Sequence, residues 1–166
     1  MACKWVVKRS HAPLYCEKDL PALMRTPASD QLVHHPIGPG SRVGLGAMTL
    51  TFSRTDHSVE TLAVRVDGGG RSLGYSADSG PGWGLSALGP GLDLAVCEAT
   101  FLSDMEGSLS HMSARQAGRS AREAGVGKLV LTHLWPGVDR RAALAEGSAA
   151  FGGSVEVAAT GTRFVP

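Results

Sequence analysis

Three apolar, strand-like stretches of this sequence each lead to a side chain that can bind a metal ion or move a proton. These side chains are Asp78, Glu98 and His133. In open α/β sheets, ligands bind beyond the carboxyl ends of the strands, so groups placed there can share one site. Two further histidines, His57 upstream and His111 between the second and third stretches, belong to the same candidate site.

The chemistry of this group favours a metal ion. His57, Asp78 and His133 offer two imidazole nitrogens and a carboxylate, a donor set that suits Zn²⁺ and also Mn²⁺ or Fe. A carboxylate can also bridge two metal ions about 3.5–4 Å apart, which generates hydroxide and holds a phosphoryl group for in-line displacement. The alternatives are a turn in which Asp78 binds its own backbone, a His133 held by hydrogen bonds at a strand end, and a loop His57 without a ligand.

Glu98 and His111 are candidates for proton transfer. Glu98 follows an apolar stretch, where a carboxylate is costly to bury unless it is paired. In the chemical interpretation it pairs with His111 and orients the imidazole to donate a proton to a leaving alkoxide. The alternative is a salt bridge from Glu98 to an arginine such as Arg115 or Arg119, with His111 exposed.

Strand and turn signals position the first half of the site. Residues 47–52 alternate in polarity, as in a half-buried strand. The Asp-Gly-Gly-Gly turn at residues 67–70 lies between two β-like segments and predicts a hairpin over residues 61–76. Earlier in the chain, a short strand is expected at 12–16 and a short helix at 17–25. Residues 26–46 are rich in proline and glycine and are predicted to be loop.

The second half alternates strand and helix. Ser113 with Gln116 fits a capping box at the start of a helix that ends near Ala124, and Asp139 fits the cap of another. The expected elements are a short helical segment at 83–88, strand 92–97, helix 113–124, strand 128–132, helix 140–151 and strand 155–159. This order predicts an α/β fold.

The overall composition limits the class of protein. A chain of 166 residues with 43% apolar residues fits one domain. The net charge of +1 gives no sign of a nucleic-acid or membrane surface. Three cysteines without a CxxC spacing favour a reducing compartment. Without a signal peptide or a membrane-length apolar run, the expected location is cytoplasmic, with no membrane partner.

Five motifs, in this order, resemble the metallo-β-lactamase superfamily and its ribonuclease Z-like branch, which includes relatives that act as cyclic-nucleotide phosphodiesterases. They are His57-Ser-Val-Glu, Tyr-Ser-Ala-Asp78-Ser-Gly, Cys97-Glu98-Ala-Thr-Phe, His111-Met-Ser and Leu-Val-Leu-Thr-His133, within residues 42–165. The resemblance implies an αββα sandwich, two sheets face to face with helices outside. It also makes a homodimer an expected assembly.

The resemblance also implies a role for each candidate residue. His57 would bind one metal ion, Asp78 would bridge two, and His133 would bind the second. Glu98 and His111 would be the acid pair that assists departure of the leaving oxygen. The implied cofactor is zinc, two ions in a complete family site, with manganese or iron as substitutes.

The sequence departs from the family pattern in three places. Ala77 stands where glycine is usual before the bridging aspartate, and Cys97 where many relatives have histidine. The family's His-x-His-x-Asp-His motif, which lies upstream in relatives, has no counterpart here. The expectation is therefore one domain, residues 1–166, that is N-terminally incomplete, with residues 1–46 as a poorly defined N-terminal segment.

Three functions are compatible with this pattern. The first is a metal-dependent hydrolase that cleaves a phosphodiester, either a cyclic nucleotide or an RNA 3′-end, with metal-activated water; this chain lacks part of the family's metal site, so the resemblance leaves its own activity open. The others are a non-catalytic remnant or binding module of the fold, and a thioester or lactone hydrolase. Ribonuclease Z-like relatives insert a basic arm where this sequence has a short glycine turn between Val66 and Arg71. This favours a small phosphodiester as the substrate partner.

Overall fold

The computed structural model describes residues 14–16 and 34–166, and the chain divides into two units between Ser41 and Arg42. In the first unit, strands β1 (Leu14–Cys16) and β2 (His34–Pro36) pair in parallel. The strand predicted at 12–16 is confirmed over its described residues. The helix predicted at 17–25 lies outside the described residues.

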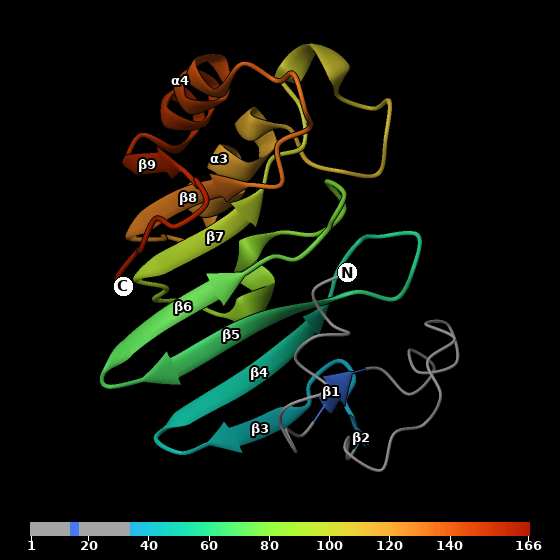
Figure 1. Ribbon diagram of the computed structural model, residues 1–166, viewed down its shortest axis with the longest axis vertical. Helices are drawn as coiled ribbons and strands as arrows, with labels where there is room; N and C mark the ends of the chain where they lie inside the picture. Colours follow the sequence, from blue (N-terminus) through green and yellow to red (C-terminus); the bar gives the residue numbers. More distant parts are fainter. Residues whose placement is uncertain (1–13, 17–33) are drawn as a thin grey trace. The chain divides into compact units, whose positions relative to one another are not determined.

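A seven-stranded sheet forms the second unit, in the order β3-β4-β5-β6-β7-β8-β9 (Figure 1). The strands are β3 (Arg42–Leu45), β4 (Met48–Arg54), β5 (Leu62–Gly68), β6 (Arg71–Tyr75), β7 (Leu94–Glu98), β8 (Lys128–Thr132) and β9 (Ser154–Val157). Strands β3 to β6 are antiparallel neighbours, and β6 to β9 are parallel. The carboxyl ends of β6, β7 and β8 therefore meet at one edge, as expected for the candidate site.

The loop predicted over residues 26–46 is wrong at two places. Both β2 and β3 fall within it. Each is short, and each forms by pairing with a neighbour: β2 with β1, and β3 with β4 across the turn at Gly46, whose φ is 59°. Sequence signals for a strand are weak in such a glycine- and proline-rich stretch, because the pairing partner provides the structure.

The predicted hairpin is confirmed. Val66 pairs with Leu73 and Gly68 with Arg71, so that only Gly69 and Gly70 form the turn. Their φ values are 60° and 74°, the left-handed conformation that a tight hairpin of this twist requires.

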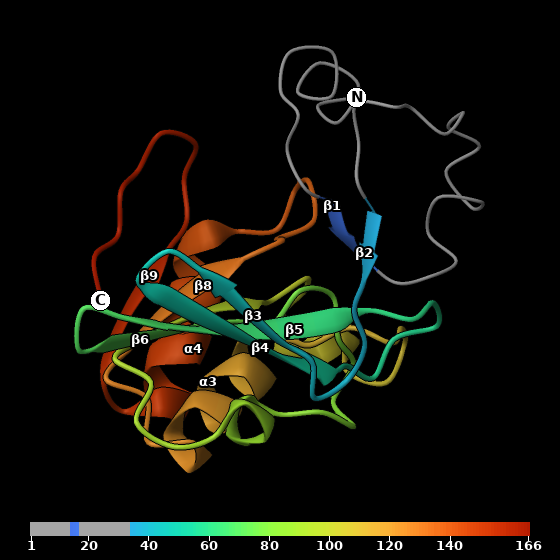
Figure 2. The same cartoon turned by 90° about the horizontal axis from the view of Figure 1, so that it is seen from below.

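Two helices cover one face of the sheet, α3 (Ala114–Glu123) and α4 (Arg140–Phe151) (Figure 2). Both predicted caps are present. The Ser113 hydroxyl accepts a hydrogen bond from the Gln116 amide at 3.0 Å, and the Gln116 side chain accepts one from the Ser113 amide at 2.9 Å. The Asp139 carboxylate accepts from the Arg141 amide at 2.8 Å. These bonds satisfy amides that the first helical turn leaves unpaired.

The core lies between this sheet face and the helices. Its buried side chains include Ala95 and Cys97 from β7, Leu129 and Leu131 from β8, Ala114, Ala117 and Ala121 from α3, and Ala143 and Phe151 from α4. The helices pack closely because both carry glycine at their contact. A Cβ on Gly118 would lie 2.5 Å from the carbonyl oxygen of Gly147. This close contact fixes α3, whose first turn follows directly on a candidate site residue.

Two short 3₁₀ helices complete the described elements, η1 (Leu85–Leu88) and η2 (Ser103–Met105). The first confirms the helical segment expected at 83–88, and Leu85 is fully buried. Within residues 14–16 and 34–166, no helix has the length and apolar character needed to cross a membrane.

Candidate metal and acid–base site

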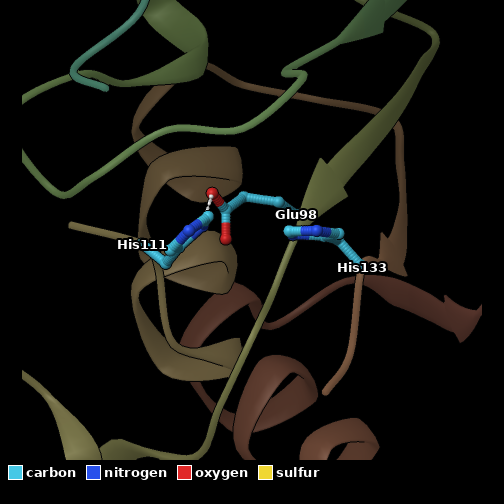
Figure 3. A group of neighbouring side chains, drawn as sticks. All are labelled: Glu98, His111 and His133. Atoms are coloured by element: carbon cyan, nitrogen blue, oxygen red, sulfur yellow. Dashed lines mark hydrogen bonds and ion pairs between the residues drawn. The ribbon is translucent and has the colours of Figure 1, made fainter. Parts of the chain in front are cut away.

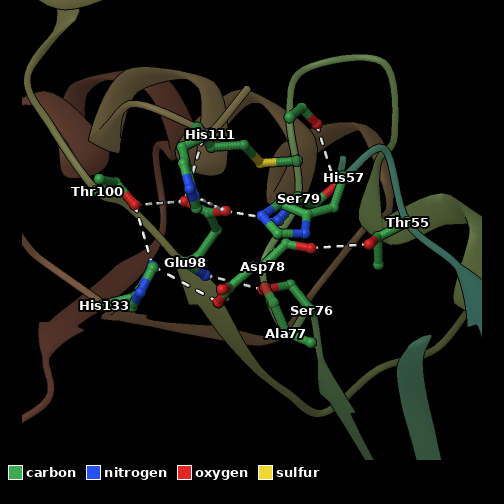
Figure 4. A network of polar contacts seen from close by, with 12 residues as sticks. Thr55, His57, Ser76, Ala77, Asp78, Ser79, Glu98, Thr100, His111 and His133 are labelled. Atoms are coloured by element: carbon green, nitrogen blue, oxygen red, sulfur yellow. Dashed lines mark hydrogen bonds and ion pairs between the residues drawn. The ribbon is translucent and has the colours of Figure 1, made fainter. Parts of the chain in front are cut away.

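The five candidate residues come from four connections around one edge of the sheet (Figure 4). His57 lies in the loop between β4 and β5, and Asp78 follows β6. Glu98 is the last residue of β7, His111 precedes α3, and His133 follows β8. Strands β7 and β8 are parallel and end at the same height in the sheet, because Glu98 pairs with Thr132.

Glu98 is buried at the centre of this group, with 1% of its surface exposed. Its Oε1 accepts hydrogen bonds from the Ser79 amide at 2.5 Å and pairs with His111 Nδ1 at 2.8 Å. Its Oε2 accepts from the Thr100 hydroxyl at 2.7 Å and the Met112 amide at 3.2 Å. A buried carboxylate needs polar partners to compensate for the loss of hydration, and Glu98 has four.

The salt bridge considered for Glu98 goes to a histidine rather than to an arginine. Among the described residues its ion pair is with His111. Arg115, one of the two arginines considered, instead binds Glu106 at 2.6 Å. Figure 3 shows the His111 ring beside the Glu98 carboxylate, with His133 across from them.

Three imidazoles converge on this edge. The His111 ring centroid lies 5.3 Å from that of His57 and 5.4 Å from that of His133. His111 is half-buried, with 19% of its side chain exposed. The structure thus brings together histidines that are distant in sequence, within reach of a small shared ligand.

Asp78 and His133 lie next to each other at the open side of the group. Asp78 Oδ1 is 3.6 Å from His133 Nδ1, and about two fifths of each side chain is exposed, 41% and 43%. In the part of the chain that the structure describes, the Asp78 carboxylate faces His133 rather than its own backbone. The turn considered as its alternative is therefore not formed.

Backbone strain marks the residues that aim these two side chains. Ala77 and His133 are the non-glycine residues with positive φ among those described, at 52° and 58°. This left-handed conformation costs an L-residue about 1–2 kcal/mol and is concentrated at functional sites. The fully buried Ser76 supports the turn, because its hydroxyl donates to the Ala77 carbonyl at 2.7 Å and accepts from the Glu98 amide at 2.9 Å.

The loop that carries His57 is docked on the loop that follows Asp78. The Asp56 carbonyl accepts from the Gly80 amide at 2.5 Å, and its carboxylate accepts from the Gly82 amide at 2.9 Å. A Cβ on either glycine would lie 2.6 Å from Asp56 Oδ2. The buried Thr55 hydroxyl also donates to the Asp78 carbonyl at 2.7 Å. These contacts connect His57 to Asp78 through the backbone.

Two titratable neighbours are held neutral. Burial raises the pKa of the Cys97 thiol to about 12, so the thiol is uncharged at neutral pH. Burial, and then the carboxylates of Asp78 and Glu98, raise the pKa of Tyr75. Both shifts reflect an apolar surrounding with negative charge at the sheet edge.

Among the described residues, the donors spaced closely enough to hold a divalent metal ion are not the three that were predicted. One ligand atom from each of Glu98, His111 and His133 lies within 4.8 Å of the other two, a grouping that the sequence analysis did not predict. The predicted set of His57, Asp78 and His133 shares His133 with it. Imidazole and carboxylate donors in such a cluster suit Zn²⁺, Mn²⁺ or Fe. Which set holds the metal remains a prediction.

Sequence reasoning missed Thr100. Its hydroxyl lies between Glu98 Oε2 at 2.7 Å and His133 Nδ1 at 3.1 Å. A signal was present, because Thr100 stands two residues after Glu98, where an extended chain places side chains on the same face.

Comparison with known proteins places the chain in a family. The family model described as "Beta-lactamase superfamily domain" matches residues 4–134, more than half of the chain. The chain belongs to the beta-lactamase superfamily. The expected α/β fold of the metallo-β-lactamase type is confirmed by a solved structure, the metallo-beta-lactamase fold protein YhfI from Bacillus subtilis. Its TM-score is 0.78 at 31% identity, over 88% of this chain and 61% of that one.

Further known proteins are similar to the chain over shorter stretches or in fold alone. The sequence of YhfI, named a probable metallo-hydrolase, is 38% identical over 97 residues, which are 58% of this chain and 40% of that protein. Ribonuclease BN of Escherichia coli is 41% identical over 90 residues, 52% of this chain and 29% of that protein. Human tRNase Z, short form, shares the fold with a TM-score of 0.66 at 17% identity, over 92% and 67% of the two chains. The chain thus spans less than half the length of these two curated relatives.

Proposed function

We propose that the protein is a metal-dependent hydrolase that cleaves a phosphodiester bond with metal-activated water. The observation that carries the proposal is the Glu98–His111 pair, joined at 2.8 Å, beside Asp78 and His133, which are predicted to bind metal. A positioned acid next to a metal-binding edge is what departure of an alkoxide requires. The names of ribonuclease BN and tRNase Z, which describe cleavage of RNA, support a phosphodiester as the bond.

His57, Asp78 and His133 are the residues that would hold the metal. When bound, metal ions supply hydroxide at neutral pH and stabilise the charge of a phosphoryl group. The Thr55 bond to the Asp78 carbonyl and the docking of Asp56 on the glycine loop join the two loops that carry His57 and Asp78. The backbone that carries these two predicted ligands is therefore held in place by hydrogen bonds.

Glu98 and His111 move the proton in this proposal. The Glu98 carboxylate accepts hydrogen bonds from two backbone amides, which can only donate. An ionised carboxylate has no proton of its own, so it also accepts from His111 Nδ1. A protonated His111 then has its second proton on Nε2. As the phosphorus–oxygen bond breaks, Nε2 gives this proton to the leaving oxygen, and the imidazole stays bound to Glu98 through Nδ1–H.

The tight turn between β5 and β6 favours a small substrate. Only Gly69 and Gly70 separate the paired residues Gly68 and Arg71. Ribonuclease Z-like relatives, to which the sequence is similar, carry a protruding arm here that grips RNA. A cyclic nucleotide is therefore our first candidate and an RNA 3′-end the second.

The test is hydrolysis of a cyclic nucleotide and of bis(p-nitrophenyl) phosphate, with added Zn²⁺ or Mn²⁺. We expect metal-dependent turnover that falls by about 100-fold or more in His111→Ala, the range of a lost general acid. Glu123→Gln, a charge change at the exposed end of α3, should leave the rate unchanged. Metal-dependent turnover that His111→Ala does not reduce would overturn the acid role. Hydrolysis of thioesters or lactones alone, or substrate binding without turnover at saturating metal, would establish the alternatives.

A further inference from the structure

The hydroxyl of Thr100 connects the acid pair to a predicted metal ligand. Thr100 is fully buried, and its Oγ1 lies 2.7 Å from Glu98 Oε2 and 3.1 Å from His133 Nδ1. Its backbone is fixed at both polar atoms, because its amide donates to the Met112 carbonyl at 2.8 Å and its carbonyl accepts from the Trp135 amide at 3.0 Å. The hydroxyl therefore has two partners and little freedom to choose others.

The direction of these hydrogen bonds follows from proton counting. A hydroxyl has one proton to donate. The Glu98 carboxylate already accepts amide hydrogen bonds on both oxygens, so the Thr100 proton goes to Glu98. Toward His133 the hydroxyl offers a lone pair, and Nδ1 must then carry a proton.

A second threonine makes the same arrangement at His57. The Thr61 hydroxyl donates its proton to the Val59 carbonyl at 3.0 Å, and a carbonyl can only accept. The same oxygen lies 3.2 Å from His57 Nδ1 and can only accept from it. Two histidines from different loops thus each have Nδ1 next to a hydroxyl that is already committed as a donor.

We propose that Thr100 and Thr61 are positioning residues that hold His133 and His57 in the Nδ1–H tautomer, so that each presents Nε2 to a divalent metal ion. The inference deepens the proposed function and rests on its metal site. Histidine ligands of metals usually donate their second ring N–H to a fixed partner, and loss of that partner costs about 10–100-fold in metal affinity. Through Thr100, the buried charge of Glu98 also orients His133.

The test uses the full chain labelled with ¹⁵N, without and with Zn²⁺. Side-chain ¹⁵N NMR at alkaline pH, where an ordinary imidazole is neutral, should show His133 and His57 as Nδ1–H tautomers. Thr100→Val removes the hydroxyl at nearly constant shape. It should shift His133 toward the Nε2–H form and weaken Zn²⁺ binding by about 10–100-fold. Thr100→Ser keeps the hydroxyl and should retain the tautomer and most of the affinity.

Thr61→Val and Thr61→Ser repeat the comparison at a less buried position, and they keep the test informative if Thr100→Val does not fold. An unchanged tautomer and affinity in both valine variants would overturn the inference, as would Zn²⁺ coordination through Nδ1. Equal losses in the valine and serine variants would assign the effect to packing and overturn it too. If the valine variants change the tautomer and the Zn²⁺ affinity but the wild type hydrolyses no substrate, the proposed function is wrong and the inference stands. If the wild type hydrolyses the substrate but the valine variants change neither quantity, the inference is wrong and the proposed function stands.

Discussion

His111 Nδ1 lies 2.8 Å from Glu98 Oε1 because the two ends of the connection between β7 and α3 pair with each other. The Thr100 amide donates to the Met112 carbonyl at 2.8 Å, and the Ala114 amide donates to the Phe101 carbonyl at 2.9 Å. This pairing returns the chain to the end of β7 before the helix begins. Backbone hydrogen bonds thus bring the two residues together, and the amides of Ser79 and Met112 hold the Glu98 carboxylate in place.

The first prediction concerns the charge of Glu98. In Glu98→Gln one carboxylate oxygen becomes an NH₂ group, which would face an N–H or O–H donor at either position. Leaving such buried groups unsatisfied costs about 1–3 kcal/mol, so the midpoint of urea unfolding should fall. Glu123→Gln provides the matched control, with no change expected. An unfolding midpoint for Glu98→Gln equal to that of the wild type would show that the four hydrogen bonds are not formed as described.

Replacing Ala77 by glycine should stabilise the fold. Its φ of 52° is left-handed, which costs an L-residue about 1–2 kcal/mol, whereas glycine adopts it freely. After the entropy that glycine loses on folding is subtracted, we expect Ala77→Gly to raise the free energy of unfolding by about 0.5–1 kcal/mol. Ala145→Gly, on the exposed face of α4, should lower it by about 1 kcal/mol. Destabilisation by both substitutions to a similar extent would contradict the strain.

The sequence predicts the local structure better than the site. The capping box at Ser113 and the glycine turn at 69–70 are encoded by adjacent residues, and both are present. Strands β2 and β3 could not be predicted, because their partners rather than their own residues make them strands. Whether Glu98 paired with His111 or with Arg115 was also open, since the answer depends on how the intervening connection folds back.

The contact between α3 and α4 gives a prediction about packing. In Gly118→Ala the new methyl group would lie 2.5 Å from the Gly147 carbonyl oxygen and 3.0 Å from the Ala150 side chain. The helices must then separate, and overpacking of this kind costs about 1–3 kcal/mol. Gly44→Ala in β3 is the control, because its added methyl meets nothing within 4 Å. Calorimetric melting of the two variants should show a lowered midpoint for the first alone.

Acid should weaken the hydrogen bonds that Glu106 accepts from Arg115 and Ser113. The hydrogen bond from Arg115 lowers the pKa of Glu106 below its usual value of 4.5, and the Ser113 hydroxyl adds to the effect. A lowered folded-state pKa stabilises the fold fully above pH 4.5, and this contribution is lost as the pH falls through the folded-state pKa. Glu106→Gln should therefore be less stable than the wild type at pH 7, with the difference shrinking in acid. A difference in urea midpoint that does not shrink as the pH is lowered from 4.5 would contradict this.

Crystals of the chain grown with Zn²⁺ would test the central claim most directly, through an anomalous difference map collected at the zinc absorption edge. The account predicts a peak bonded to the Asp78 carboxylate and to Nε2 of His133 or His57, at about 2.0–2.2 Å. Glu98 should remain hydrogen-bonded to His111, with neither residue bound to the metal. A peak held instead by Glu98 and His111 would contradict the account, because the proposed acid pair would then be the metal site.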